Sequence, residues 1–117
     1  MAQVQIFGVR SSQATRAAER FFKERGVPIQ FVDLAQRPMA PAEMKRFVDR
    51  FGLADLVDDH GKSYEANGLK YMKLSNSELI AKIERDPKLL RLPLVRFGTQ
   101  VSAGQDESAW REMLAKP

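Results

Sequence analysis

The sequence of 117 residues contains no cysteine and only one histidine, His60. Without cysteine, this chain can form no disulfide, no thiolate metal site and no cysteine nucleophile. One histidine is too few for a histidine-rich metal site, and Asp58-Asp59 lacks the further carboxylates that a hard cation prefers. We therefore expect no metal ion in this protein, and we interpret Asp58-Asp59 as part of a polar turn.

Long hydrophobic runs are missing as well. The apolar runs are far shorter than the ~20 residues that cross a membrane, so no membrane contact is expected. Met1-Ala2-Gln3 leads directly into a strand-like run, which indicates no signal peptide and predicts a cytoplasmic protein. The net charge is +4, but the basic residues are spread along the chain. This spread favours a solvated surface and makes nucleic acid a poor candidate partner.

The spacing of apolar residues predicts an α/β protein with elements in the order β-α-β, several helices, then β-β-α. Period-two patterns predict strands at 3–7, 27–34, 94–97 and 100–103. Helical patterns predict helices at about 13–25, 41–51, 75–85 and 106–114, with less regular short helices between 52 and 72. The strand-helix-strand start predicts two parallel strands, and the turn at Gly98-Thr99 predicts an antiparallel pair. We expect one domain over residues 1–117, with a mixed four-stranded sheet and a helical insert at about 40–88.

The stretch at residues 6–16 is the first candidate site, because an apolar strand runs through a turn into an amphipathic helix. Gly8 is expected to end the strand, because glycine can adopt a positive φ angle. Ser11 or Ser12 is expected to cap the helix, whose free N–H groups and dipole attract negative charge. A catalytic Ser12 would need a neighbouring base, for which His60 is the only histidine. Helix capping is the simpler interpretation of the two serines, and a solvated loop position is the simpler one for His60.

Two further segments carry a resemblance to a known family. Tyr64-Glu65-Ala66-Asn67-Gly68-Leu69 resembles a Tyr-x-x-x-Gly-Leu segment, and Asp86-Pro87-Lys88-Leu89-Leu90-Arg91-Leu92-Pro93-Leu94-Val95 is similar to a signature in which a proline precedes the third strand. With the strand-turn-helix at Ser12, these segments resemble the arsenate reductase family, which includes the Spx-type regulators. The resemblance covers almost the whole chain and implies a thioredoxin-like fold. It also implies that the Leu92-Pro93 peptide bond is cis.

The resemblance places the family's nucleophilic cysteine on Ser12 and its second cysteine on Thr15, while the arginine that follows is kept as Arg16. The oxyanion-binding arginines of the family fall near Asp58, on Leu92, and in the turn at Gly104-Gln105, so none of them is kept. Arg91 and Arg96 flank the proline and could replace these arginines, although a solvated position on the strand is an equally good interpretation.

These substitutions separate the expected function from that of the family, whose members are glutathione- or glutaredoxin-linked oxidoreductases. Disulfide exchange and arsenate reduction need a sulfur atom that takes up electrons, and serine cannot replace it. We therefore predict a family-related protein that is inactive in thiol redox chemistry and binds a small anionic ligand or a protein. The candidate ligand-binding residues are Arg10, Ser11, Ser12, Gln13, Arg16, Arg91, Leu92 and Pro93.

Two alternatives remain open. The first is a glutathione-dependent reductase or transferase that holds the ligand's own thiol at Ser12, with glutathione as the only cofactor considered. The second is an Spx-like transcriptional regulator that binds RNA polymerase. Gly52 resembles a glycine of that branch, but a glycine at the end of a helix is common in proteins generally.

Overall fold

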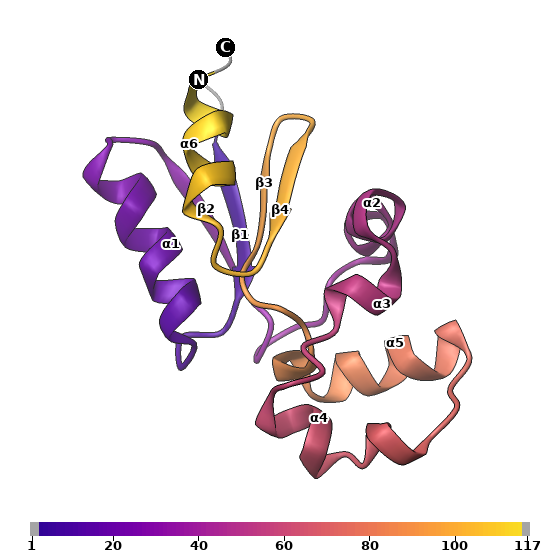
Figure 1. The fold of residues 1–117 in the computed structure, drawn as a ribbon. Helices are drawn as coiled ribbons and strands as arrows, with labels where there is room; N and C mark the ends of the chain where they lie inside the picture. The colour runs from indigo at the N-terminus through magenta and orange to yellow at the C-terminus, as the bar shows by residue number, and fades with distance from the viewer. Residues whose placement is uncertain (1–2, 116–117) are drawn as a thin grey trace.

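The computed structural model describes residues 3–115 and contains one mixed sheet with the strand order β2-β1-β3-β4 (Figure 1). The strands are β1 (Val4–Gly8), β2 (Ile29–Asp33), β3 (Leu94–Phe97) and β4 (Gln100–Ala103). β1 runs parallel to β2 and antiparallel to β3, and β3 runs antiparallel to β4. The predicted α/β fold with a mixed four-stranded sheet is therefore confirmed, although β2 is shorter at both ends than predicted.

The helices fall into three places along the sequence. α1 (Gln13–Glu24) connects β1 to β2, α6 (Glu107–Ala115) follows β4, and a group of helices lies between β2 and β3. The intervening group is α2 (Pro41–Phe51), α3 (Leu53–Leu56), α4 (Lys62–Ala66) and α5 (Asn76–Arg85), with 3-10 turns at Leu69–Tyr71 and Pro87–Leu89. Figure 1 shows α1 and α6 beside the sheet, while α2 to α5 gather in a separate group below and beside the strands.

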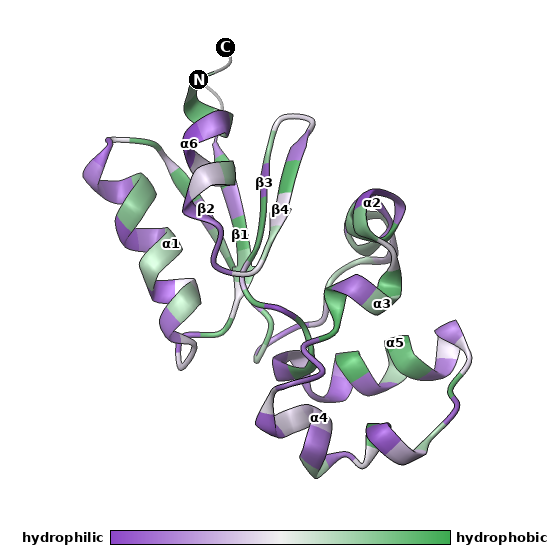
Figure 2. Ribbon diagram, in the orientation of Figure 1, coloured by the Kyte–Doolittle hydropathy of each residue, from purple (hydrophilic) through white to green (hydrophobic). Residues whose placement is uncertain are grey.

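The two faces of the sheet carry separate hydrophobic clusters. Val4, Ile6 and Val95 pack with Phe22 and Trp110 in the cluster under α1 and α6. Residues of alternate positions, such as Phe7 and Leu94, belong to the second cluster, which includes the apolar side chains of α2, α3 and α5. In Figure 2 hydrophobic and hydrophilic residues alternate along the strands, and the helices carry bands of both kinds.

Local capping explains why α1 begins and ends where it does. The Ser12 Oγ atom accepts a hydrogen bond from the Thr15 N–H at 3.2 Å, which satisfies one of the free donors of the first turn. At the other end, Gly26 adopts a φ angle of 70°, a left-handed conformation that suits a helix terminus. The predictions of a serine cap and of the helix end at Gly26 are both confirmed.

Gly8 ends β1, as predicted, but it does so without the positive φ angle that glycine can adopt. Its importance comes from the close approach of Thr15, because a Cβ atom on Gly8 would lie 2.6 Å from the Thr15 Cγ2 atom. The absent side chain therefore sets how closely α1 packs against the end of β1.

Candidate functional site

The start of α1 and the Leu92-Pro93 segment lie at the same edge of the sheet. Phe7 of β1 is paired with Leu94 of β3, and the two strands are antiparallel. The chain that leaves β1 toward Ser12 therefore lies beside the chain that enters β3 through Pro93. The Leu92-Pro93 bond is cis, as the resemblance implies. The fold thus brings together two segments that are about eighty residues apart in the sequence.

Backbone donors at the start of α1 are only partly used. The Ser12 N–H donates to the Val9 carbonyl at 3.1 Å, and the Arg16 N–H donates to the Ser12 carbonyl at 3.1 Å. Thr15 uses its N–H with the Ser12 hydroxyl, as described above. Within residues 3–115, neither the Gln13 nor the Ala14 N–H group has a hydrogen-bond partner. Two free donors therefore remain at the positive end of the helix dipole.

The backbone next to the cis-proline is also incompletely paired. The Arg91 and Pro93 carbonyls both accept from the Gly104 N–H, at 2.9 and 3.0 Å. Leu92, which lies between them, makes no hydrogen bond through its N–H or its carbonyl in the described part of the chain. It therefore offers one donor and one acceptor, as an edge strand does to an added strand. Leu92 itself is half-buried, whereas Pro93 is buried.

Arg10 and Arg16, the predicted cations nearest the start of α1, differ in whether their side chains already interact with other residues. The Arg10 guanidinium lies 4.5 Å from the centroid of the Phe31 ring and 3.9 Å from the Glu19 carboxylate. Arg16 is exposed and forms no ion pair with any described residue. A polar hollow beside the helix is lined by Gln13, Arg16, Ala17, Arg20 and Gln105. Arg16 is therefore the predicted cation that is best placed to meet an anion.

Arg91 and Arg96 are held by hydrogen bonds to other parts of the protein. Arg91 Nε donates to the Val57 carbonyl at 3.3 Å. Arg96 donates to the Gln5 side chain at 3.1 Å and to the Gly98 carbonyl at 2.9 Å. Arg96 also lies three residues beyond Pro93, which is ~10 Å along a strand. Arg96 therefore belongs to the sheet rather than to the edge that carries Ser12.

The structure does not bring His60 to Ser12. The His60 side chain is 93% exposed, and its Nε2 atom lies 3.5 Å from the Asp59 carboxylate. The Asp58 carboxylate accepts a hydrogen bond from the His60 N–H at 3.2 Å, which is the polar turn expected from the sequence. Residues 3–115 contain no hydrogen bond between Ser12 and His60. The single histidine of the sequence therefore makes no hydrogen bond through which it could act as a base for Ser12.

Thr15, at the position of the family's second cysteine, is fully buried. Its Oγ1 atom has no hydrogen-bond partner in the described structure. Burial beneath Gly8 keeps it from direct contact with a ligand, whereas Ser11 and Gln13 are exposed and Ser12 is half-buried. The candidate site consequently consists of the Ser12 hydroxyl, free backbone groups and the exposed side chain of Arg16.

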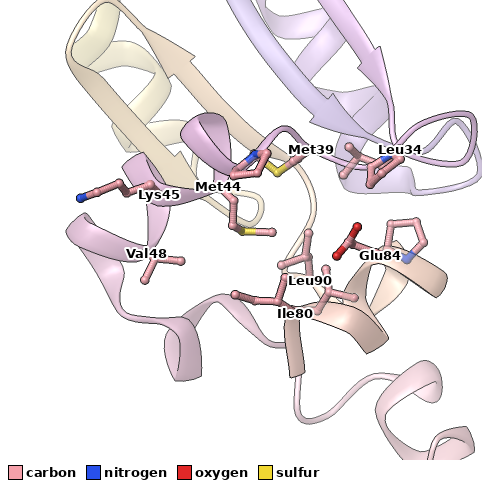
Figure 3. A pocket seen from close by; sticks show the side chains of 12 residues that line it. Leu34, Met39, Met44, Lys45, Val48, Ile80, Glu84 and Leu90 are labelled. Carbon is pink, nitrogen blue, oxygen red and sulfur yellow. The ribbon is translucent and has the colours of Figure 1, made fainter. Parts of the chain in front are cut away.

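Sequence reasoning missed a second feature, a cavity of about 320 Å³ whose lining is mostly apolar. It lies between α2 and α5, and Figure 3 shows the side chains that line it. None of the predicted ligand-binding residues lines this cavity. The only sequence signal was the apolar spacing of the two helices, which looks the same whether their side chains close a core or leave a gap.

Metal-binding clusters and membrane-spanning helices are both absent from residues 3–115. No group of three or more histidine, cysteine or acidic residues is arranged to hold a metal ion in this range. None of the described helices has the length and apolar character needed to cross a bilayer.

The model of the ArsC family matches residues 7–113. This chain belongs to the ArsC family. It is 26% identical over 106 residues to YusI of Bacillus subtilis, covering 83% of this chain and 86% of YusI. It is 24% identical to the global transcriptional regulator Spx of Streptococcus mutans, covering 97% of this chain and 84% of the regulator.

Solved structures share the fold of this chain. An arsenate reductase from Vibrio cholerae has a TM-score of 0.78 at 22% identity, covering 96% of this chain and 98% of that protein. The YFFB protein has a TM-score of 0.83 at 15% identity, covering 96% and 99%. The resemblance noted in the sequence and its thioredoxin-like fold are thereby confirmed, and this ArsC-family chain has no cysteine.

Proposed function

We propose that this ArsC-family chain is a binding protein without thiol redox activity, and that it holds a peptide-like anionic small molecule at the edge formed by α1 and Leu92. Glutathione is the first candidate ligand. The observation that carries the proposal is the set of unpaired backbone groups, namely the N–H and carbonyl of Leu92 and the N–H groups of Gln13 and Ala14. An extended peptide-like ligand can use the first pair, and its anionic group can use the second.

The chemistry of Ser12 favours binding over catalysis. Its Oγ atom already accepts the Thr15 N–H, so its hydroxyl proton remains available to donate to an anionic atom. A carboxylate or a ligand thiolate would be such an acceptor. Ionisation of the hydroxyl itself would require a base, and His60 lies on a separate exposed turn. The residue therefore suits a hydrogen-bond donor to the ligand, and any redox chemistry would have to use the ligand's own sulfur.

A titration with reduced glutathione tests this proposal. We expect saturable changes in the amide NMR signals of residues 11–15 and 92–94 at millimolar ligand. Arg16→Gln should weaken the binding, because it removes the free cation beside the helix start. The matched control is Arg46→Gln on α2, which removes the same charge from an exposed position outside the site and should leave the binding unchanged. The absence of saturable shifts at both segments would refute the proposal.

Ser12→Cys tests whether the helix start still favours an anion. Free N–H groups at a helix N-terminus lower the pKa of a thiol, so the introduced thiol should react with iodoacetamide faster at neutral pH than an ordinary exposed thiol. Ala81→Cys, at an exposed position within α5, provides that comparison. Equal reactivity of the two variants would show that the anion-stabilising property was lost together with the cysteine.

A protein partner is the second candidate function. It is favoured by the match to Spx regulators and by the exposure of Tyr71 and Met72, whose relative exposed areas are 86% and 47%. These two side chains follow one another at the end of the 3-10 turn Leu69–Tyr71. RNA polymerase, the partner implied by the Spx-like alternative, is the protein to test in purified form. Binding that Tyr71→Ser weakens, and that glutathione leaves unchanged, would favour this function over the first.

A further inference from the structure

The cavity between α2 and α5 is separate from the edge that carries Ser12. Leu34 and Met39 line it from the segment after β2, Met44 and Val48 from α2, Ile80 from α5, and Leu90 from the segment before β3. Its volume of about 320 Å³ is within the range of small-molecule pockets, ~300–1,000 Å³. Figure 3 shows these side chains arranged around a common space.

The cavity has a structural cause. Met44 and Val48 are one helical turn apart on α2, and Ile80 and Ile83 are three residues apart on α5, so both helices present an apolar stripe. In Figure 2 the hydrophobic bands of α5 lie on the side toward α2 and α3. Both stripes contribute to the cavity lining instead of closing completely against one another. The result is a partly enclosed apolar space between the two helices.

Charge is unevenly distributed around this space. Among the lining residues only Lys45 and Glu84 are charged. The Lys45 ammonium is bonded to the Asp49 carboxylate at 2.7 Å, and Figure 3 shows it directed away from the cavity. The Glu84 carboxylate forms no ion pair within residues 3–115, and Figure 3 shows it turned toward the enclosed space. The cavity therefore combines an apolar lining with one free negative charge.

We propose that this cavity binds a small molecule that has an apolar body and one primary ammonium group. The apolar body lies among Met39, Met44 and Ile80, where it removes apolar surface from water. The ammonium group pairs with the Glu84 carboxylate at the side of the cavity. A ligand with a carboxylate in the same place would meet a like charge, because Lys45 is already paired with Asp49. The proposal is independent of the function assigned to the edge at Ser12.

Three ligands of equal chain length test the proposal: octylamine, octanol and octanoate. The probe is the full chain labelled with ¹³C at the methionine methyl groups. Octylamine should cause saturable shifts of the Met39 and Met44 signals, since both side chains line the cavity. Met113, which is buried in the cluster under α6, should not shift. Octanol should bind about fivefold more weakly than octylamine, as expected for a partly exposed ion pair, and octanoate more weakly still.

Variants separate the charge effect from general hydrophobic binding. Glu84→Gln should abolish the preference for octylamine over octanol, while the matched Glu112→Gln on α6 should retain it. Val48→Phe should reduce binding of all three ligands, because a larger side chain fills the space. If this variant does not fold, the Glu84→Gln comparison alone decides the question, since Glu84 is exposed.

Several results would overturn the proposal. These are equal binding of octylamine and octanol, tighter binding of octanoate, or no saturable shift at Met39 and Met44. A dependence of these two signals on protein concentration, without displacement by octylamine, would indicate instead that a second copy of the chain covers the cavity.

Discussion

The contact between Gly8 and Thr15 gives the sharpest test of how α1 is positioned. Gly8→Ala would place a Cβ atom 2.6 Å from Thr15 Cγ2 and 3.1 Å from Thr15 Cβ. Ordinary contacts between carbon atoms are ~3.5–4.0 Å, so the backbone or the helix would have to move. Both residues are buried, and β1 is an interior strand of the sheet with a neighbour on each side. The substitution therefore forces a shift within a packed region.

The magnitude follows from opposing effects. Overpacking of a core costs up to ~3 kcal/mol, whereas replacing glycine with alanine in a strand recovers ~0.5–1 kcal/mol of backbone entropy. Gly8→Ala should therefore destabilise the protein by ~2 kcal/mol. In a Thr15→Ala background the Oγ1 and Cγ2 atoms are gone, and the closest remaining contact is the one at 3.1 Å. In that background Gly8→Ala should change the free energy of unfolding by close to nothing. The double-mutant cycle should therefore give a coupling free energy of ~2 kcal/mol between residues 8 and 15.

The assay is urea unfolding of the original protein, the two single variants and the double variant, followed by far-UV circular dichroism. The comparison requires that the free energy of unfolding decreases with urea concentration at the same slope in all four proteins. Additive effects, with Gly8→Ala costing the same in both backgrounds, would refute the close approach of Thr15 to Gly8. A large coupling would confirm that the missing side chain at Gly8 fixes the position of α1.

Three further predictions concern the caps and the buried hydroxyl. Thr15→Val should stabilise the protein by ~1 kcal/mol in thermal unfolding, because it removes a buried hydroxyl without a partner; a loss of stability would show that the hydroxyl is satisfied. Ser12→Ala should cost ~1 kcal/mol through loss of the cap, and Ser11→Ala at most ~0.5 kcal/mol; similar costs in urea unfolding would contradict the assignment of Ser12 as the cap. Hydrogen bonds with Ser75 lower the pKa of the Glu78 carboxyl below its ordinary value of 4.5. The larger effect comes from the Ser75 backbone and the smaller one from the Ser75 side chain. The resulting stabilisation of α5 is therefore complete above about pH 4.5 and is lost as the pH falls through the lowered pKa. The hydrogen-exchange protection factors of α5, corrected for the intrinsic exchange rate at each pH, should fall more with acid in the original protein than in Glu78→Gln, and identical profiles would contradict this.

Local features of the fold could be predicted because they depend on neighbouring residues. Ser75 and Glu78 form the capping box expected at the start of α5, and Ser12 caps α1. Trp110 is buried under α6 as expected from helical spacing, although Met113 rather than Leu114 is its most buried neighbour on the helix. In each case the pattern lies within one helical turn or two, so the sequence alone carries the information.

Contacts that depend on the exact distance or angle between distant residues could not be predicted. Arg96 bonds to Gln5 because β3 pairs with β1, which places residues ninety-one positions apart side by side. The contact between Gly8 and Thr15 depends on the angle at which α1 crosses the strand. The cavity beside Glu84 depends on the distance between α2 and α5. Apolar spacing identifies the inner face of each helix but not how tightly two faces meet.

The same distinction bears on the binding site that we propose at Ser12 and Leu92. The thiol and the oxyanion-binding arginines that the resemblance assigns are side chains, and single substitutions remove them. The free groups at Leu92, Gln13 and Ala14 belong to the backbone, so they persist as long as the strand, the turn and the helix form. The binding of a peptide-like anionic ligand, as proposed for this chain, therefore requires neither the cysteines nor those arginines.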